Sequence, residues 1–264
     1  MDLINKTHTT PEARKELYNQ FNNATPYKHL VIDNFLTPEL AEQMFVKFPA
    51  YELFNKKYDG MNEKKAEGSN FQDFDPVFTD FKKFVSSPEF CEWITDVTGI
   101  KDVFVTDDAL GTGLHQGGTG SFLDVHVDFS MHHLLNVYRR LNLLVFFNKG
   151  WQEDYKGHTE LWNADMTKLE KKVLPIFNRA VMFETTGTSY HGYGKINPPE
   201  GVTRKSFYTY FYTKENDGAH KEGYHDTIFK ARPEEGITKK VVTDVKESAK
   251  NFVKRTLKRL GVSF

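Results

Sequence analysis

The sequence predicts a mainly β fold with flanking helices (class α+β), in which the strands form a sandwich or a barrel. From residue 102 onward, short apolar runs alternate with turn residues, and their spacing is typical of all-β folds. Helical patterns occur toward the two ends of the chain. Aromatic residues make up 14% of the 264 residues, with 23 Phe and 12 Tyr, which suits a β-rich core or the lining of a pocket.

The first hundred residues predict four helices and one strand. Thr10 can cap the first helix, and Pro11 suits its first position. The predicted helices span residues 10–23, 37–47, 76–86 and 88–98, and the strand spans residues 29–35. Residues 51–75 are polar and contain Gly, Asn and Lys, so we predict a long mobile loop that covers a site.

The predicted strands of the second half span residues 103–107, 122–128, 140–148, 159–162, 179–185, 189–192 and 206–213. A final helix is predicted at residues 238–260, where apolar positions form one stripe and many Lys and Arg lie outside it. We expect this helix to pack by its stripe; binding to an anionic membrane or a partner is the alternative. The expected domains are a helical region at 1–100, a β core at 101–235 and the C-terminal helix at 236–264.

Charge and cysteine content exclude several classes of function. The formal net charge is −1, from 35 basic and 36 acidic side chains, which argues against nucleic-acid binding as the main role. The single cysteine, Cys91, excludes an intrachain disulfide and a cysteine-based zinc site. The N-terminus lacks the apolar segment of a signal peptide, and no run of 18 apolar residues occurs. We therefore expect a cytoplasmic protein without stable membrane insertion.

His126 and Asp128 form a candidate metal site with a third residue, His191. Residues i and i+2 of a strand point to the same face, so His126 and Asp128 can reach one point. His191 follows another predicted strand and is flanked by small residues. Two imidazoles and one carboxylate on one face of a metal, with the other face open, suit non-haem Fe(II) oxygenases. The triplet alone is weak evidence, because ten histidines make chance matches common.

Arg204 and Ser206 extend the pattern beyond the metal ligands. A guanidinium pairs with a carboxylate through two hydrogen bonds, and a serine two residues on shares the same strand face. Together they could hold the far carboxylate of a dicarboxylic acid whose keto-acid end binds iron. Lys205, between them, points to the opposite face. The alternative is a surface Arg-Lys pair before an edge strand.

Four segments resemble one known family. The resemblance rests on the HxD triplet, the strand RRLNLLVFFN at 139–148 followed by Trp151, the segment KGHTELW at 156–162, and the segment PIFNRAVMF at 175–183 before the distal histidine. The chain is similar over residues 100–232 to the 2-oxoglutarate- and Fe(II)-dependent oxygenases, in their prolyl-4-hydroxylase-like branch. Two departures are Lys156 in place of the first of two glycines and His158-Thr159 in place of a more apolar pair.

The resemblance implies a double-stranded β-helix, which is a jelly-roll barrel, with the N-terminal helices packed outside. It implies iron at His126, Asp128 and His191 and 2-oxoglutarate at Arg204. Asp128 is present, unlike in the halogenating relatives, which have a small residue there. The expected cofactors are Fe(II), 2-oxoglutarate and O₂, with ascorbate as a further candidate. The expected activity is hydroxylation of an unactivated C–H bond with release of succinate and CO₂.

The primary substrate stays open among a protein prolyl residue, a free amino acid and another small molecule. A homodimer is a candidate assembly. Two other functions are kept: a barrel that has lost catalysis and serves as a binding module, and a cupin-type dioxygenase that needs no co-substrate. Asn142 and Tyr210 fall in predicted strands that line the barrel, so both are candidate contacts of 2-oxoglutarate, although core filling is the commoner role for Tyr. We expect no ligand role for His132 and His133, and we expect His115 in a flexible glycine-rich loop near the site.

Overall fold

The computed structural model describes residues 1–216, 218–221, 223–236, 239 and 243. Its helices are α1 (Pro11–Asn23), α2 (Pro38–Val46), α3 (Pro76–Val85) and α4 (Pro88–Thr98), with short 3₁₀ turns at Lys6–His8, Tyr51–Leu53, Phe71–Asp73 and Glu153–Tyr155. Its strands are β1 (His29–Ile32), β2 (Lys56–Asp59), β3 (Glu63–Gly68), β4 (Thr112–Gly117), β5 (Phe122–Val127), β6 (Tyr138–Phe146), β7 (Thr159–Trp162), β8 (Leu169–Val173), β9 (Arg179–Glu184), β10 (His191–Tyr193), β11 (Arg204–Thr213) and β12 (Ile228–Phe229).

All four predicted helices of the first hundred residues are confirmed, and they begin alike. Each has a capping side chain followed by proline at the first helical position: Thr10, Thr37, Asp75 and Ser87 accept a hydrogen bond from a backbone N–H of the first turn. The cap satisfies a donor that the helix leaves free, and proline has no N–H to leave unpaired. The local sequence therefore sets where these helices start.

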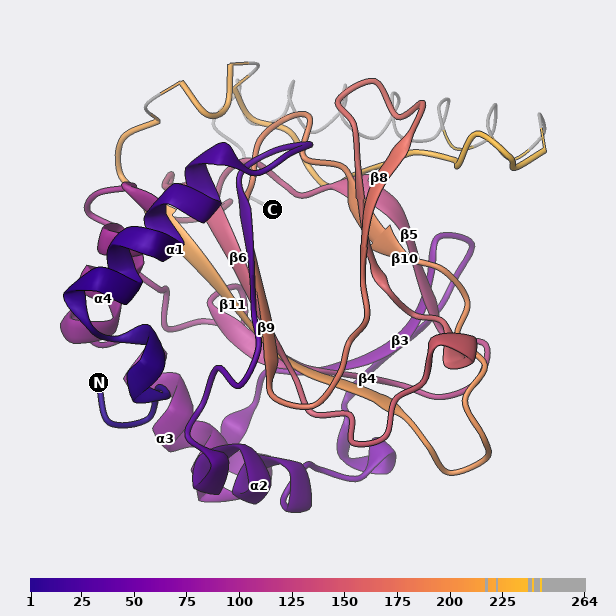
Figure 1. The fold of residues 1–264 in the computed structure, drawn as a ribbon. Coiled ribbons are helices and arrows are strands. Elements are labelled where there is room, and N and C mark those ends of the chain that lie inside the picture. Colours follow the sequence, from indigo (N-terminus) through magenta and orange to yellow (C-terminus); the bar gives the residue numbers. More distant parts are fainter. Residues whose placement is uncertain (217, 222, 237–238, 240–242, 244–264) are drawn as a thin grey trace.

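The strands form one antiparallel sheet that curves into a nearly closed barrel (Figure 1). The strand order is β1-β9-β6-β11-β4-β3-β5-β10-β7-β8, with β2 paired to β3 and β12 paired to β5. The predicted fold class, a jelly-roll barrel with flanking helices, is confirmed. Of the predicted strands, 103–107 is wrong, because only Phe104 pairs there, in a single bridge to Tyr212. The sequence did not predict β8 and β12.

Residues 51–75 are not the predicted loop. They contain the β2–β3 hairpin, and β3 lies inside the sheet between β4 and β5. The glycine-rich stretch around His115 is likewise a strand, β4, paired with β3 and β11. Gly113 serves packing here, because a Cβ at this position would lie 2.3 Å from the Tyr208 hydroxyl. Both segments were misread because glycines and charged residues stand where a strand normally has apolar ones.

The predicted C-terminal helix and the 236–264 domain lie almost entirely outside the described residues. The N-terminal helices and the barrel share one apolar core, and the domain boundaries stay a prediction. β1 pairs with β9 within the barrel sheet, so the first hundred residues contribute β1 as well as the β2–β3 hairpin and the helices.

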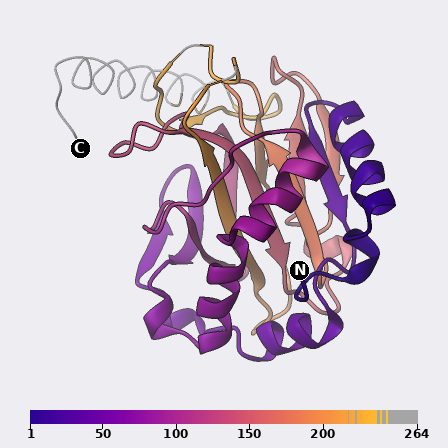
Figure 2. The same ribbon diagram turned by 90° about the vertical axis from the view of Figure 1, so that its left-hand side faces the viewer.

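The helices cover the outer face of the β9–β6–β11 part of the sheet, as Figures 1 and 2 show. Aromatic rings fill the layer between them. The Phe207 ring of β11 lies 4.8 Å from the Phe81 ring of α3, and the Phe90 ring of α4 lies 6.2 Å from the Phe211 ring. Phe81, Phe90, Phe207 and Phe211 are fully buried. Much of the high aromatic content is therefore core, which supports the barrel wall from outside.

Asn178 ties the end of β1 to the barrel and accounts for part of the PIFNRAVMF segment. Its backbone has a φ of 57°, a conformation that Asn tolerates better than most residues. The side-chain amide accepts a hydrogen bond from the Leu36 N–H at 2.9 Å and donates one to the Leu36 carbonyl at 3.0 Å. These bonds hold the loop that leads into α2 against the sheet.

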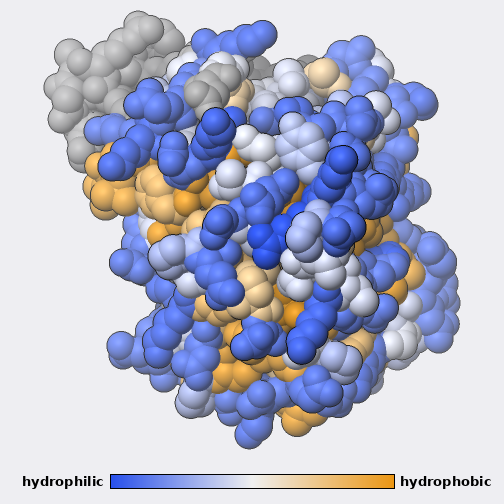
Figure 3. Space-filling view, turned by 60° about the vertical axis from the view of Figure 1, so that its left-hand side comes forward, coloured by the Kyte–Doolittle hydropathy of each residue, from blue (hydrophilic) through white to orange (hydrophobic). Residues whose placement is uncertain are grey.

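On the face shown in Figure 3, most of the surface is hydrophilic, and hydrophobic side chains form separate patches. None of the helices described is both long enough and apolar enough to cross a bilayer. The homodimer stays a prediction.

Removal of the Phe81 ring tests the packing of the helices on the barrel. We expect Phe81→Ala to lower the free energy of unfolding by about 3–5 kcal/mol, because it opens a cavity in a fully buried aromatic layer. Val46→Ala is the control, because Val46 is 65% exposed and its truncation should cost less than about 0.5 kcal/mol. Denaturant unfolding measures both, and equal losses would contradict this account of the core.

Candidate metal centre and active-site cavity

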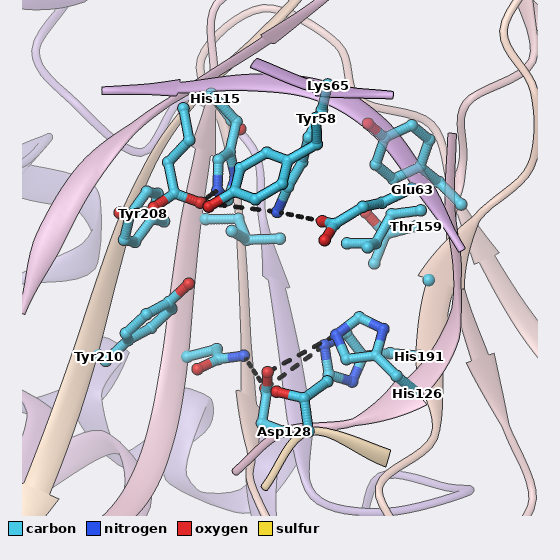
Figure 4. A pocket seen from close by; sticks show the side chains of 18 of the residues that line it. Tyr58, Glu63, Lys65, His115, His126, Asp128, Thr159, His191, Tyr208 and Tyr210 are labelled. Carbon is cyan, nitrogen blue, oxygen red and sulfur yellow. Dashed lines mark hydrogen bonds and ion pairs between the residues drawn. The ribbon is translucent and has the colours of Figure 1, made fainter. Parts of the chain in front are cut away.

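A cavity of about 310 Å³ lies inside the barrel and holds every site residue that the sequence singled out as a metal or 2-oxoglutarate contact. Strands β3, β4, β5, β6, β9, β10 and β11 all contribute side chains to its wall. Figure 4 shows the cavity from close by, with His126, Asp128 and His191 gathered at one end and Lys65, Glu63 and His115 at the other.

His126, Asp128 and His191 converge as predicted. Each offers one ligand atom, and these atoms all lie within 4.8 Å of one another. The Asp128 carboxylate is 3.6 Å from His126 Nε2 and 3.4 Å from His191 Nε2. His126 is directly opposite His191 in the antiparallel pairing of β5 and β10, which brings together residues 65 positions apart in the chain. All three side chains are buried.

Hydrogen bonds fix which imidazole nitrogen faces the metal position. His126 Nδ1 lies 2.9 Å from the Asp124 carbonyl, and His191 Nδ1 lies 3.0 Å from the Ser189 carbonyl. Because a carbonyl oxygen can only accept, both Nδ1 atoms carry the proton and both Nε2 atoms keep a free lone pair. Burial and the nearby His126 lower the pKa of His191 to about 4, so this imidazole is neutral at physiological pH. The donor set fits Fe(II).

Asp128 is held in place by two residues of β6. The Asn142 amide donates to Asp128 Oδ2 at 2.6 Å, and the Arg139 guanidinium lies 3.2 Å from the same oxygen. Arg139 also donates to the Asn142 carbonyl oxygen at 2.7 and 3.0 Å, so the three side chains form one network. Burial by itself would raise the pKa of Asp128, but Arg139 and the two histidines outweigh it and hold the pKa well below its usual range. The carboxylate is therefore charged and oriented before any metal arrives.

Arg204 is a buried cation without an anionic partner among the residues described. Its Nε donates to the Gly157 carbonyl at 2.9 Å, and its guanidinium lies over the rings of Tyr193 at 4.2 Å and Phe146 at 4.9 Å. Burial lowers its pKa to about 10, which still leaves it charged at neutral pH. A Cβ on Gly157 would lie 3.3 Å from Arg204 Cδ and 2.5 Å from Ile196, so glycine permits this approach.

Ser206 lies next to Arg204 on the inner face of β11, and its predicted orientation is correct. Its hydroxyl is buried and has no hydrogen-bond partner among the described residues. Lys205 points outward, with its ammonium 5.7 Å from the Phe45 ring of α2. Arg204 and Ser206 thus present a cation and a free hydroxyl to the cavity, which is the donor set that a carboxylate needs.

The remaining candidates divide into cavity residues and structural ones. Tyr210 lines the cavity and stacks on Arg139, with the guanidinium 3.4 Å from its ring centroid. His132 is outside the cavity wall: its Nε2 bonds Asp108 at 2.7 Å and its Nδ1 accepts two backbone N–H groups. His133 does not line the cavity either. His115 does line it, from a strand rather than the predicted loop, 3.4 Å from Glu67.

Sequence reasoning missed Arg139 and the charged residues of β3. Arg139 was part of a segment used for the family resemblance, yet nothing in its spacing indicates that it meets Asp128. Glu63, Lys65 and Glu67 alternate as a strand requires, and that period of two was the available signal. It was overlooked because the alternating residues are charged, which normally indicates solvent.

A cluster of two histidines and one carboxylate inside a jelly-roll barrel is the arrangement that suits a non-haem iron oxygenase. Residues 112–212 match the family model described as the 2OG-Fe(II) oxygenase superfamily, where 2OG is 2-oxoglutarate. These residues are therefore similar to the oxygenases of this superfamily, and His126, Asp128, His191 and Arg204 all lie inside the matched segment. No curated protein matches the chain in sequence.

Several solved structures share the fold at low sequence identity. A prolyl-4-hydroxylase from Pseudomonas putida is 15% identical, with a TM-score of 0.55 over 76% of this chain and 100% of that one. A prolyl hydroxylase from Trichoplax adhaerens, in complex with a hypoxia inducible factor peptide, is 18% identical, with a TM-score of 0.54 over 76% and 91%. HygX from Streptomyces hygroscopicus, with nickel, 2-oxoglutarate and hygromycin B bound, is 11% identical, with a TM-score of 0.51 over 80% and 94%. At these identities the likeness shows the fold and leaves the substrate open.

Removal of the Asn142 amide tests its role in positioning Asp128. We expect Asn142→Leu to weaken binding of Fe(II) or Mn(II) by about 10- to 100-fold, because a neighbour that orients a metal-binding carboxylate is lost. Asn148→Leu is the matched control: Asn148 is also buried, but it does not line the cavity and bonds the Pro175 carbonyl and the Lys205 N–H. It should lower stability and leave metal affinity unchanged. Equal metal affinity in Asn142→Leu and the wild type would rule the role out.

Proposed function

We propose that this chain is a hydroxylase that binds Fe(II) through His126, Asp128 and His191 and 2-oxoglutarate through Arg204 and Ser206. It inserts one oxygen atom of O₂ into an unactivated C–H bond of a small-molecule or peptidyl substrate, and the other atom enters succinate as 2-oxoglutarate loses CO₂. The observation that carries this proposal is the presence, in one cavity, of the three-ligand cluster and of a buried guanidinium that pairs with no carboxylate among the described residues.

The protein's own residues do three things in this reaction. The two Nδ1 hydrogen bonds orient both imidazoles so that their Nε2 atoms face one point. Arg139 and Asn142 hold Asp128 charged and oriented. Arg204 and Ser206 receive the distal carboxylate of 2-oxoglutarate, which sets the position of its keto-acid end. Bound iron would supply the activation of O₂ for the oxidative step.

Two other functions are less well supported. A barrel that only binds its ligand would not need a carboxylate held ready between Arg139 and Asn142. A dioxygenase without co-substrate would leave the Arg204 charge buried and uncompensated, which is costly. Fe(II) binding together with slow 2-oxoglutarate turnover in the absence of substrate would exclude the first, and succinate formation would exclude the second. Ascorbate dependence is a separate expectation that the same assay tests.

Single substitutions of the three ligands test the metal site. We expect His126→Ala, Asp128→Ala and His191→Ala each to abolish 2-oxoglutarate turnover at limiting Fe(II) while the fold persists, because each removes a third of the ligand set. Succinate release and metal titration measure the effect, and circular dichroism verifies folding. His8→Ala is the control, since His8 bonds the backbone at Asp33 and Asn34, away from the cavity. A variant with near wild-type turnover would exclude that residue as a ligand.

Arg204 and Lys205 form a matched pair for the co-substrate site. Arg204→Ala should raise the apparent KM for 2-oxoglutarate at least about 30-fold, since truncating one partner of a buried charge pair costs about 2–5 kcal/mol. Arg204→Lys should fall in between, because lysine keeps the charge and loses the two-pronged geometry. Lys205→Ala should leave the KM unchanged, and Fe(II) binding should persist in all three. A raised KM in Lys205→Ala alone would reverse the assignment.

A further inference from the structure

The β2–β3 hairpin gives the cavity a charged wall that faces the metal cluster. Glu63, Lys65 and Glu67 alternate along β3 and all line the cavity, joined by Lys56 and Tyr58 of β2. Figure 4 shows Lys65 and Glu63 across the open space from His126 and Asp128. The hairpin lies outside residues 112–212, so it is no part of the segment that matches the oxygenase superfamily. We call these five residues the β3 wall.

Most charges of the β3 wall neutralise one another. Lys65 is 8% exposed, and its ammonium lies 3.4 Å from Glu63 and 3.7 Å from Glu67. Glu67 is further held by Lys56 at 3.6 Å and by the Tyr208 hydroxyl, which donates to it at 3.3 Å. Burial would raise the pKa of Glu67, but the contacts with His115 and Lys65 lower it far below its usual range. Burial and Lys65 also lower the pKa of His115 to about 4, so its ring is neutral.

Glu63 is the member of the wall with capacity to spare. Lys65 is its one ion-pair partner among the described residues, and no side-chain hydrogen bond to its carboxylate is found there. In Figure 4 its carboxylate projects into the cavity. Lys65 has three N–H groups and two carboxylate neighbours, which leaves one N–H for a further acceptor. The wall therefore offers the carboxylate of Glu63 and, two residues further along β3, the ammonium group of Lys65.

We propose that the primary substrate is a small zwitterion of the free amino acid class, whose ammonium group binds Glu63 and whose carboxylate binds Lys65. The proposal rests on the proposed function, because it places the substrate between the β3 wall and the metal cluster. Arg204 and Ser206 hold the co-substrate elsewhere in the cavity, so the two carboxylates do not compete for one cation. The remaining part of the amino acid would then extend toward His126, Asp128 and His191.

The same wall disfavours the other substrate classes. A prolyl residue within a polypeptide carries no charge, so it would cover Glu63 and Lys65 without replacing the water that solvates them, which is unfavourable. A second dicarboxylate would be repelled by Glu63 and Glu67, and a simple amine would leave the spare N–H of Lys65 unused. A zwitterion satisfies both groups at once.

The test is a binding experiment under argon, so that no turnover occurs. The full chain, loaded with Fe(II) and 2-oxoglutarate, is titrated calorimetrically with each of the standard amino acids. For each amino acid that binds, the titration is repeated with its N-acetyl derivative, which lacks the ammonium charge, and with its amide, which lacks the carboxylate. We expect at least one free amino acid to bind and each derivative to bind at least about tenfold more weakly, because each derivative loses one charge contact inside the cavity. A proline-containing hexapeptide is titrated in parallel.

Glu63→Gln localises the effect. It should weaken binding of the free amino acid at least about tenfold and leave the N-acetyl derivative unaffected, because that derivative has no charge for Glu63 to meet. Asp59→Asn is the matched control on the same hairpin: Asp59 is 77% exposed, pairs with Lys64 and does not line the cavity. It should leave binding unchanged, and thermal unfolding verifies that both variants fold.

Three results would overturn this substrate class alone: no free amino acid binds although 2-oxoglutarate does, N-acetylation leaves the affinity unchanged, or the hexapeptide binds more tightly than every free amino acid. Failure of 2-oxoglutarate itself to bind the Fe(II)-loaded wild type would instead overturn the proposed function, and this inference with it. The two failures are therefore distinguishable in one set of titrations.

Discussion

The pairing register of β5 and β10 is the constraint on which the site depends. It places His126 directly opposite His191, and the strand period then puts Asp128 on the same face. A slip by one residue would turn one histidine to the outside of the barrel and separate the ligands. The register is held by apolar residues buried on the other side and by the strands that flank the pair, β7, β3 and β12. The metal centre is thus a property of the whole sheet rather than of a local motif.

The buried charges of the cavity differ in how they are compensated. Arg139 compensates Asp128 at one end, and the carboxylates of the β3 wall compensate Lys65 at the other. Arg204 differs because aromatic rings and a carbonyl surround it, and no carboxylate among the described residues pairs with it. In a low-dielectric interior an uncompensated cation is unfavourable, so its presence indicates an anionic ligand. The charge pattern supports 2-oxoglutarate binding independently of the family resemblance.

The cavity is lined by residues of the segment that matches the superfamily and by residues of the β2–β3 hairpin, which lies outside that segment. Residues 112–212 supply the three candidate metal ligands, Arg204 and Ser206, and match the superfamily. The β2–β3 hairpin precedes them in the chain and inserts β3 between β4 and β5, so its charged face becomes a wall of the same cavity. A strand inserted into the sheet is a rigid support for recognition, in contrast to a mobile lid. We therefore place substrate selection on this hairpin.

Local sequence determined the helices, most strands and the ligand set. Capping residues with proline fixed the four helix starts, and the apolar period fixed β5, β6, β9 and β11, because these signals act between residues close in the chain. His126, Asp128, His191 and Arg204 were identified by residue type and order. The tertiary structure decided what depends on distant partners: the contact of Arg139 with Asp128, the strand character of β3 and β4, and the inward direction of Glu63 and Lys65. From the sequence alone, a charged residue is expected to lie at the surface. Only the folded barrel places such residues in the wall of a cavity.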